Sequence, residues 1–293
     1  MIRRLVITAD DFGLAPGVDS GIIDAAAAGS VTAVSVIVNL LPANQLAARI
    51  ARLRLAAPYV GVGLHFNCTA GRPLTSAPTL TRRSSGEFLS LPELLMRALT
   101  GRLYARDVAD ECAAQLDALA AVAGRISHID SHRHVHTLPG IWTGVTDVAR
   151  RYKIPHVRLP IEAWRLRPLD VRATARKAFL RSAMYVAARK TPATVDRTSR
   201  FVGISLHGNR RFSTRLLHYL DRLPAGTTEL MVHPGFVDPE VRRHDGYVNG
   251  REIELRALLS DVVRERLTRG DIVLTQYGVV HPGAVPLEAQ ARR

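Results

Sequence analysis

Short apolar runs of strand type alternate with helix-type stretches along most of this 293-residue chain. Successive apolar runs are not joined by hairpin signals, so neighbouring strands are expected to be parallel and connected through helices. The runs predicted to form strands are Leu5–Ala9, Ala33–Val38, Val60–Leu64, His128–Ser131, His156–Leu159, Val202–Leu206, Glu229–Val232 and Ile272–Thr275.

The helix-type stretches between these runs complete a repeating strand–helix pattern. They cover Val18–Ala28, Ala43–Leu55, Asp107–Val122, Ile141–Arg151, Val171–Lys190, Ser213–Leu220 and Arg251–Leu267. About eight strand–helix units predict an α/β fold built as a (β/α) barrel, TIM-like and either regular or distorted. An open, doubly wound sheet is the alternative.

Residues 1–281 are predicted to form a single barrel domain, and residues 282–293, which lack periodicity, a loose tail. Two long segments interrupt the strand–helix rhythm, Asn67–Ser90 after the third strand and Pro234–Asn249 after the seventh. Long loops in compact domains are often lids or binding loops, so both segments are candidate binding loops.

The first predicted strand runs directly into two adjacent carboxylates, Asp10 and Asp11, within the stretch VITADDFG at residues 6–13. Adjacent carboxylates repel each other, so burying both is costly without a cation or a shared proton. One interpretation is a solvated turn. The other is a metal ligand beside a general base.

Most of the unusual polar residues fall at the carboxyl ends of the predicted strands. In a parallel barrel these ends share one face, where the strand-following loops build the active site. A site is therefore expected on that face. The residues that we place there are Asp10, Asp11, Asn39, His65, His132, His134, His136, Arg158, His207, His233 and Gln276.

The densest histidine cluster is HIDSHRHVH at residues 128–136. Alternate residues of an extended chain share a face, so His132, His134 and His136 are predicted to point the same way. A catalytic metal commonly has about three protein ligands and one open position, which one Asp and two His residues would satisfy. A surface loop with scattered histidines is the alternative.

Several stretches together resemble the YdjC/ChbG-like family of carbohydrate deacetylases. They are TADDFG with the following GIIDAAAAGSVTAVSVIVN, then VGLHFN and AGRPL, HIDSHRHVH, VRLP and ELMVHPGF, in this order from about Leu5 to Tyr277. The resemblance implies a metal-dependent (β/α)-barrel hydrolase that releases acetate from N-acetylated amino sugars, either chitooligosaccharide-like or linked to a glycolipid. Arg133 departs from the family pattern, because relatives often carry His or Gln there.

By this resemblance, Asp11, His65 and His132 hold the metal and Asp10 is the catalytic base. The family is usually described as using Mg, whereas two imidazoles would also suit Zn or another transition metal. We expect His233 to be the acid that protonates the departing amine, because an amide nitrogen leaves poorly as an anion.

The remaining strand-end residues are predicted to bind substrate or to support the catalytic groups. An arginine in a short strand is usually paired, and Asp10 and Glu162 are the carboxylates that we expect to pair with Arg158. An Asp10 partner would hold that base ionised. The other residues in this group are Asn39, His134, His136 and His207.

The formal net charge is +14, and the segment Arg165–Lys190 contributes +7 of it, from eight basic residues and one acid. A GC-rich genome would produce the same arginine excess without functional meaning. The functional alternative is peripheral contact with an anionic membrane or with an acidic substrate. Specific nucleic-acid binding is not expected, because aromatic residues make up only 5% and are not interleaved with the basic ones. Self-association into a homo-oligomer is left open.

A cytoplasmic location is expected. No apolar run reaches the roughly 18 residues that span a bilayer, and a secretory signal has no room before the Asp pair. Cys68 and Cys112 form no C-x-x-C pair and are predicted to be reduced thiols. Rival functions are another metal-dependent amidohydrolase or phosphoesterase on the same barrel, or a non-catalytic protein that binds glycans or anions.

Overall fold

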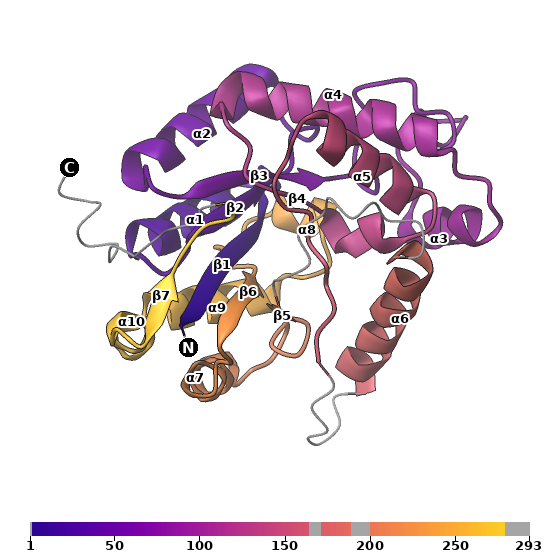
Figure 1. Ribbon diagram of the computed structural model, residues 1–293. Coiled ribbons are helices and arrows are strands. Elements are labelled where there is room, and N and C mark those ends of the chain that lie inside the picture. The colour runs from indigo at the N-terminus through magenta and orange to yellow at the C-terminus, as the bar shows by residue number, and fades with distance from the viewer. Residues whose placement is uncertain (1, 164–170, 189–199, 279–293) are drawn as a thin grey trace.

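The computed structural model describes residues 2–163, 171–188 and 200–278 (Figure 1). Its strands form one parallel sheet in the order β4-β3-β2-β1-β6-β5, with β7 paired to β1. They are β1 (Arg3–Phe12), β2 (Ala33–Val36), β3 (Gly61–Phe66), β4 (Ile129–Ser131), β5 (Arg200–Val202), β6 (Gly226–Val232) and β7 (Ile272–Leu274).

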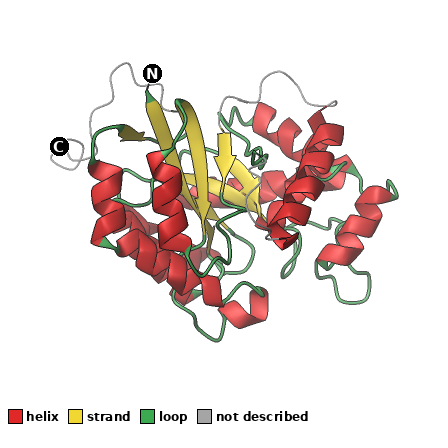
Figure 2. Ribbon diagram, turned by 90° about the horizontal axis from the view of Figure 1, so that it is seen from below, coloured by secondary structure: helices red, strands yellow, loops and turns green. Residues whose placement is uncertain are grey.

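Helices surround this curled sheet, and most of them cover its outer face (Figures 1 and 2). They are α1 (Pro16–Ala27), α2 (Ala43–Ala56), α3 (Leu91–Leu99), α4 (Ala105–Ala123), the 3-10 segment η1 (His132–Thr137), α5 (Ile141–Arg151), α6 (Val171–Ala188), α7 (Phe212–Asp221), α8 (Val241–His244), α9 (Asn249–Leu259) and α10 (Asp261–Thr268). The predicted tail at 282–293 lies outside the described residues.

The predicted strand at His156–Leu159 is wrong as a full strand. Parallel bridges at Ile129–Val157 and Glu162–Phe201 are what connect this segment to β4 and β5. Pro155 and Pro160 flank it and have no N–H to donate, so a regular ladder cannot continue through the segment. The architecture is therefore an α/β fold with a curled parallel sheet that forms a half-barrel rather than a regular closed barrel.

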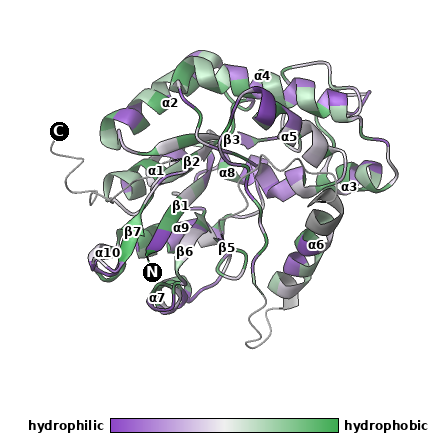
Figure 3. Ribbon diagram, in the orientation of Figure 1, coloured by the Kyte–Doolittle hydropathy of each residue, from purple (hydrophilic) through white to green (hydrophobic). Residues whose placement is uncertain are grey.

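Alternate side chains of β1 point into two different buried regions, an apolar one and a polar one. Leu5, Ile7 and Ala9 are fully buried in the main hydrophobic core that the sheet shares with its surrounding helices. The intervening Thr8 and Asp10 are equally buried but face polar partners inside the curl of the sheet. Hydrophobic and hydrophilic residues also mix along the outer helices (Figure 3), as expected for helices with one solvated face.

Three further details differ from the sequence predictions or extend them. The predicted strand Val202–Leu206 is wrong apart from Val202: β5 covers Arg200–Val202, and the chain turns from Gly203, whose φ is +150, onwards. Helix α3 was not predicted; it starts at a capping box formed by Ser90 and Glu93. Cys68 and Cys112 are buried free thiols, and within the described ranges no helix is long and apolar enough to cross a membrane.

Gly13 closes the turn after β1 and gives a test of this backbone geometry. Its φ is +91, and a Cβ atom there would lie 2.3 Å from the carbonyl oxygen of Ile37. Gly13→Ala is therefore expected to lower the free energy of unfolding by about 1–3 kcal/mol, measured by chemical denaturation. Gly29→Ala is the matched control, because Gly29 has φ +80 but open space around the added carbon. An equal loss of unfolding free energy in the two variants would contradict the close approach of Gly13 to the Ile37 carbonyl oxygen.

Candidate active site

The two carboxylates at the end of β1 reach the same site because the strand is irregular there. Adjacent side chains of a regular strand point to opposite faces. Asp11 has φ +73, and the pairing register with β2 shifts between Ala9 and Phe12, which is the signature of a β-bulge. Such bulges re-aim side chains next to active sites. Asp10 and Asp11 are consequently both buried at the same end of the sheet.

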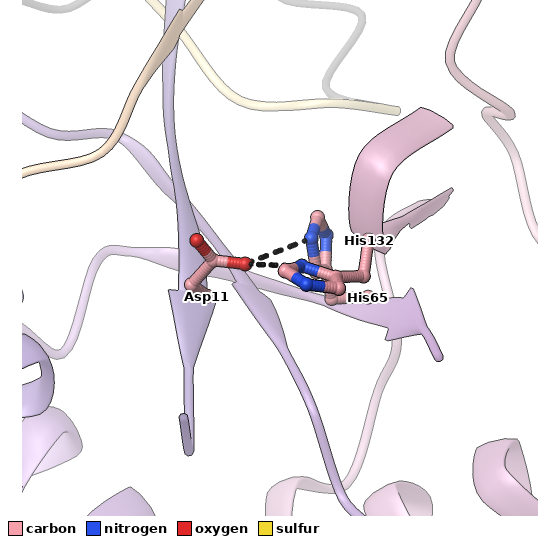
Figure 4. Close-up of side chains that lie close together, drawn as sticks. All are labelled: Asp11, His65 and His132. Carbon is pink, nitrogen blue, oxygen red and sulfur yellow. Dashed lines mark hydrogen bonds and ion pairs between the residues drawn. The ribbon is translucent and has the colours of Figure 1, made fainter. Parts of the chain in front are cut away.

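Asp11 lies against two histidines that come from other strands (Figure 4). Its Oδ1 atom is 3.2 Å from His65 Nε2, on β3, and 2.9 Å from His132 Nδ1, directly after β4. The three potential ligand atoms all lie within 4.8 Å of one another, and all three residues are buried. One carboxylate and two imidazoles thus converge as a donor set for a divalent cation.

His65 is held in place by a carboxylate on its other ring nitrogen. Asp130 Oδ1 is 2.6 Å from His65 Nδ1, and Ser35 donates a hydrogen bond to Asp130 Oδ2 at 2.7 Å. Metal-binding histidines commonly have this kind of support, which fixes the ring and its tautomer. Burial lowers the pKa of His65, but Asp130 and Asp10 outweigh it and raise that pKa to about 10.

A second group, made of Asp10, His65 and Asp130, also brings three potential ligand atoms together. Its carboxylates already have strong partners. Arg158 donates to both oxygens of Asp10 and pairs with Asp130 Oδ2 at 2.7 Å, and Ser35 donates to the same Asp130 oxygen. Of the two groups, Asp11, His65 and His132 is therefore the better candidate to hold a cation.

Arg158 is the fully buried centre of the charged network. Its Nη1 and Nη2 atoms donate to the two oxygens of Asp10 at 2.6 and 2.7 Å, and its Nε atom donates to Glu229 at 2.6 Å. Of the two expected partners, the structure thus pairs Arg158 with Asp10. Burial raises the pKa of Asp10 to about 7, and the attraction of Arg158 offsets only part of that rise.

His233 lies near Asp10, and His207 packs against His233. His233 Nε2 is 3.9 Å from Asp10 Oδ2, and the ring centroids of the two histidines are 4.8 Å apart. The His207 ring stacks on the Tyr247 ring, with 3.7 Å between the ring centroids. The backbone N–H of His233 donates a hydrogen bond to Glu254 at 2.6 Å. Burial and the nearby His207 hold the pKa of His233 well below its usual value.

A cavity of about 650 Å³ lies over these groups. Its polar lining includes Asp10, Asp11, His65, His132, His134, His207 and His233, and apolar side chains such as Leu95, Leu138 and Leu180 form the remaining wall. The volume is in the range of small-molecule binding sites. Both predicted catalytic residues and all three predicted ligands therefore border one cavity.

The predicted common orientation of His132, His134 and His136 is wrong. Arg133 and His134 adopt left-handed backbone angles, with φ values of 59° and 56°, so the segment is not extended. His134 lines the cavity beside Phe201. His136 is instead buried in the core, where its ring nitrogens contact the Ser131 hydroxyl and the backbone oxygen of Arg158.

Asn39 has a structural position rather than one at a strand end. Strand β2 ends at Val36, and Asn39 follows in the next turn. Its Nδ2 atom donates to the backbone oxygens of Ala70 and Arg72, and its Oδ1 atom accepts from Asn67. Asn39 therefore anchors the loop after β3.

Two basic residues of the segment, Lys177 and Arg176, contact other parts of the protein. Lys177 forms a buried ion pair with Glu162 at 2.8 Å, and Arg176 lines the cavity, where its Nη1 lies 3.1 Å from His207 Nδ1. Residues 164–170 and 189–190 of the segment lie outside the described residues.

Four residues of the site were not predicted from the sequence: Asp130, Glu229, Asp245 and Arg251. Asp130 falls inside the motif HIDSH and precedes the ligand candidate His132 by two residues, a spacing that could have marked it as a support. Arg251 could not be found in this way. It reaches Asp11 from α9, 240 positions along the chain.

Comparison with known proteins places this chain in a family. Residues 4–269 match the sequence model of the YdjC-like protein family. A carbohydrate deacetylase of Geobacillus stearothermophilus is 34% identical over 94% of this chain and 97% of its own. A chitooligosaccharide deacetylase of Yersinia pestis is 31% identical over 92% and 96%, respectively.

The fold also matches a crystal structure from Enterococcus faecalis, described as that of a proposed cellobiose-phosphate cleavage protein. That match has a TM-score of 0.71 at 21% identity and covers 94% of this chain and 98% of the other. It supports the curled α/β fold alone. The extent of the family match and the relatives above 30% identity confirm the resemblance seen in the motifs: the chain belongs to the YdjC-like family, whose relatives named here are carbohydrate deacetylases.

Proposed function

We propose that this protein is a divalent-metal-dependent carbohydrate deacetylase that hydrolyses the N-acetyl group of an amino sugar to acetate and a free amine. The observation that carries the proposal is the convergence of Asp11, His65 and His132 beside the Arg158-bound carboxylate of Asp10. The names of the relatives support the reaction class.

Asp11, His65 and His132 would hold the metal. Their donor atoms fit a small cation, since a carboxylate oxygen and two imidazole nitrogens lie within 4.8 Å of one another. When bound, the ion supplies Lewis-acid polarisation of the acetyl carbonyl and acidifies water. The resemblance favours Mg, and the two imidazoles equally suit Zn or another transition metal.

Asp10 would act as the base that accepts a proton from the attacking water. The bidentate contact with Arg158 fixes its orientation at the cavity floor. A pKa of about 7 is well matched to proton transfer near neutral pH. We predicted that Arg158 holds Asp10 ionised; Arg158 does lower the pKa of Asp10, but burial raises it by more.

His233 would pass a proton to the departing amine. Its pKa is well below the usual value, so the imidazole is neutral in the resting protein and must first receive the proton. Asp10 would supply it: its Oδ2 atom lies 3.9 Å from His233 Nε2, so the transfer requires the two atoms to move closer or one water to bridge them. In this order, the proton that leaves water reaches the amide nitrogen through two neighbouring side chains.

His134, His207 and Arg133 border the same cavity and are placed to contact the sugar. The chain length of the sugar and any lipid attachment are left open in this proposal. We also propose that the protein is cytoplasmic and that it self-associates. A further proposal is that segment 165–190 contacts anionic membranes. Preferential sedimentation with anionic vesicles at low salt would support the membrane contact.

Removal and return of the metal test the proposed function. Chelated protein is expected to release no acetate from N-acetylchitooligosaccharides, and added Mg²⁺ or Zn²⁺ is expected to restore the release, because the ion polarises the carbonyl. Parallel assays with phosphorylated sugars should yield no phosphate. Acetate release at an undiminished rate by metal-free protein, or phosphate release, would contradict the proposal.

His233→Ala is expected to lower kcat roughly 100-fold through loss of the proposed acid. The loss should shrink for aryl amides, whose amines leave more readily, and a comparison of the two substrate types measures this. His218→Ala is the control, since His218 is a surface histidine on α7. An equal loss with both substrate types would argue that His233 has a structural role instead.

A further inference from the structure

The two oxygens of Asp11 have different partners. Oδ1 faces the nitrogen atoms of His65 and His132, at 3.2 and 2.9 Å. Oδ2 accepts a hydrogen bond from Nη2 of Arg251 at 2.6 Å. One oxygen of this carboxylate is thus directed towards the proposed metal position, while the other is occupied by a guanidinium.

Arg251 is itself firmly held. The side chain is fully buried on α9, and its Nε atom donates to the backbone oxygen of Tyr247 at 2.8 Å. The same Nη2 that contacts Asp11 also donates to Asp245 at 2.7 Å, and the guanidinium carbon lies 5.5 Å from the Tyr247 ring centroid. Because the guanidinium is a rigid plane, these contacts together fix the donor that reaches Asp11.

This arrangement bears on the number of ligand atoms that Asp11 can provide. A carboxylate binds a cation through one oxygen or through both, and binding through both fills an additional coordination position. A catalytic site of about three protein ligands depends on a position that stays free for the reacting group. A charge-assisted hydrogen bond is a strong competitor for the second oxygen.

We propose that Arg251 is a positioning residue that keeps Asp11 a one-oxygen ligand and thereby preserves a free coordination position. The inference rests on the proposed metal site and extends it to a residue outside the ligand set. The residue acts through Asp11, from the far end of the chain.

Variants that lack the Arg251 guanidinium are expected to keep the metal but lose turnover. Removing a nearby positive charge does not weaken the attraction of the site for a cation, so the metal stays bound. Asp11 then binds through both oxygens, and kcat falls about 10–100-fold, the usual range for loss of a group that orients a metal ligand. Retained metal with lost turnover separates this role from simple loss of folding.

Co²⁺ is the probe, because its visible absorption reports the coordination number. Arg251→Met and Arg251→Lys, each loaded with Co²⁺, are expected to absorb less strongly per bound ion than the wild type, as the coordination sphere fills. Lysine keeps the charge, but its single ammonium cannot replace the planar fork. Arg266→Met is the matched control: Arg266 is also buried and paired with two carboxylates, Asp221 and Asp271, and should leave the spectrum unchanged.

An unchanged Co²⁺ spectrum in either folded Arg251 variant would overturn the inference and leave the proposed function intact. Loss of Co²⁺ from the folded Arg251→Lys protein would also overturn it, because Arg251 would then be needed for affinity itself. Wild-type protein that binds no Co²⁺ would contradict the proposed function and this inference together. If Arg251→Met does not fold, Arg251→Lys decides the matter.

Discussion

Asp10→Asn is expected to lower kcat by about 10²–10⁴-fold, because the amide cannot accept the proton that the proposed base removes from water. Metal content should persist, since Asp11, His65 and His132 are unchanged. The measurements are acetate release at saturating substrate and metal analysis of the purified variant. The fold should also persist, although less stably: the amide oxygen still accepts one hydrogen bond from Arg158, the amide NH2 faces the other donor, and Arg158 keeps Asp130 and Glu229.

Glu111→Gln is the matched control for this substitution. Glu111 is a fully buried carboxylate that accepts backbone hydrogen bonds from Leu74 and Thr75, within the loop that follows β3. Its change to an amide should affect stability far more than kcat. If Asp10→Asn retains wild-type turnover, Asp10 is not the base and the proposed proton path through His233 fails with it.

His132→Ala is expected to abolish metal binding and, with it, acetate release. The substitution removes one of three ligand atoms, and two ligands are too few to fix a catalytic metal in a defined geometry. His136→Ala is the control within the same segment. His136 contacts Ser131 and the Arg158 backbone in the core, so its loss should lower stability but leave the metal in place.

Metal analysis of His132→Ala, Asp130→Asn and Asp10→Asn also separates the two candidate ligand groups. Asp10, His65 and Asp130 form the second group that could hold an ion. Undiminished metal in His132→Ala, together with metal loss in Asp130→Asn and Asp10→Asn, would move the site to that group. We expect the opposite pattern, because Arg158 already occupies the oxygens of Asp10 and Asp130.

The residues that meet at the site were predictable, because their meeting depends only on the common direction of the parallel strands. Any fold that places the ends of β1, β3, β4 and β6 at one edge brings Asp10, Asp11, His65, His132 and His233 together. The family resemblance then assigned their roles. Most helix positions were also predictable, since the apolar periodicity of a helix reflects packing against the sheet. The exceptions are α3, which was missed, and the predicted helix Arg251–Leu267, which is divided at Ser260 into α9 and α10.

Local backbone irregularities were not predictable from these patterns. The left-handed conformation of Asp11 turns both carboxylates to one site, and those of Arg133 and His134 send His134 and His136 in different directions. Non-glycine residues rarely adopt such angles, so no simple periodicity anticipates them. The surrounding packing holds them in place.

Long-range charge pairing was predictable only in part. A lone arginine in a short strand implies a carboxylate partner, and this reasoning left Asp10 and Glu162 as the alternatives for Arg158, of which Asp10 is the partner. It could not show that Asp130 and Glu229 share the same guanidinium, or that Arg251 binds the second oxygen of Asp11. Those contacts depend on how the sheet curls, which brings distant parts of the chain to one buried point.

Mass spectrometry of a panel of N-acetylated sugars tests the central claim most directly. Metal-loaded protein is incubated with N-acetylchitooligosaccharides of different lengths and with N-acetylated glycolipids, beside the Asp10→Asn variant. The account predicts that at least one substrate loses the mass of an acetyl group replaced by hydrogen, with equimolar acetate, and that Asp10→Asn shows almost none of this product. No such mass loss from any amino sugar, or an equal loss with Asp10→Asn, would contradict it.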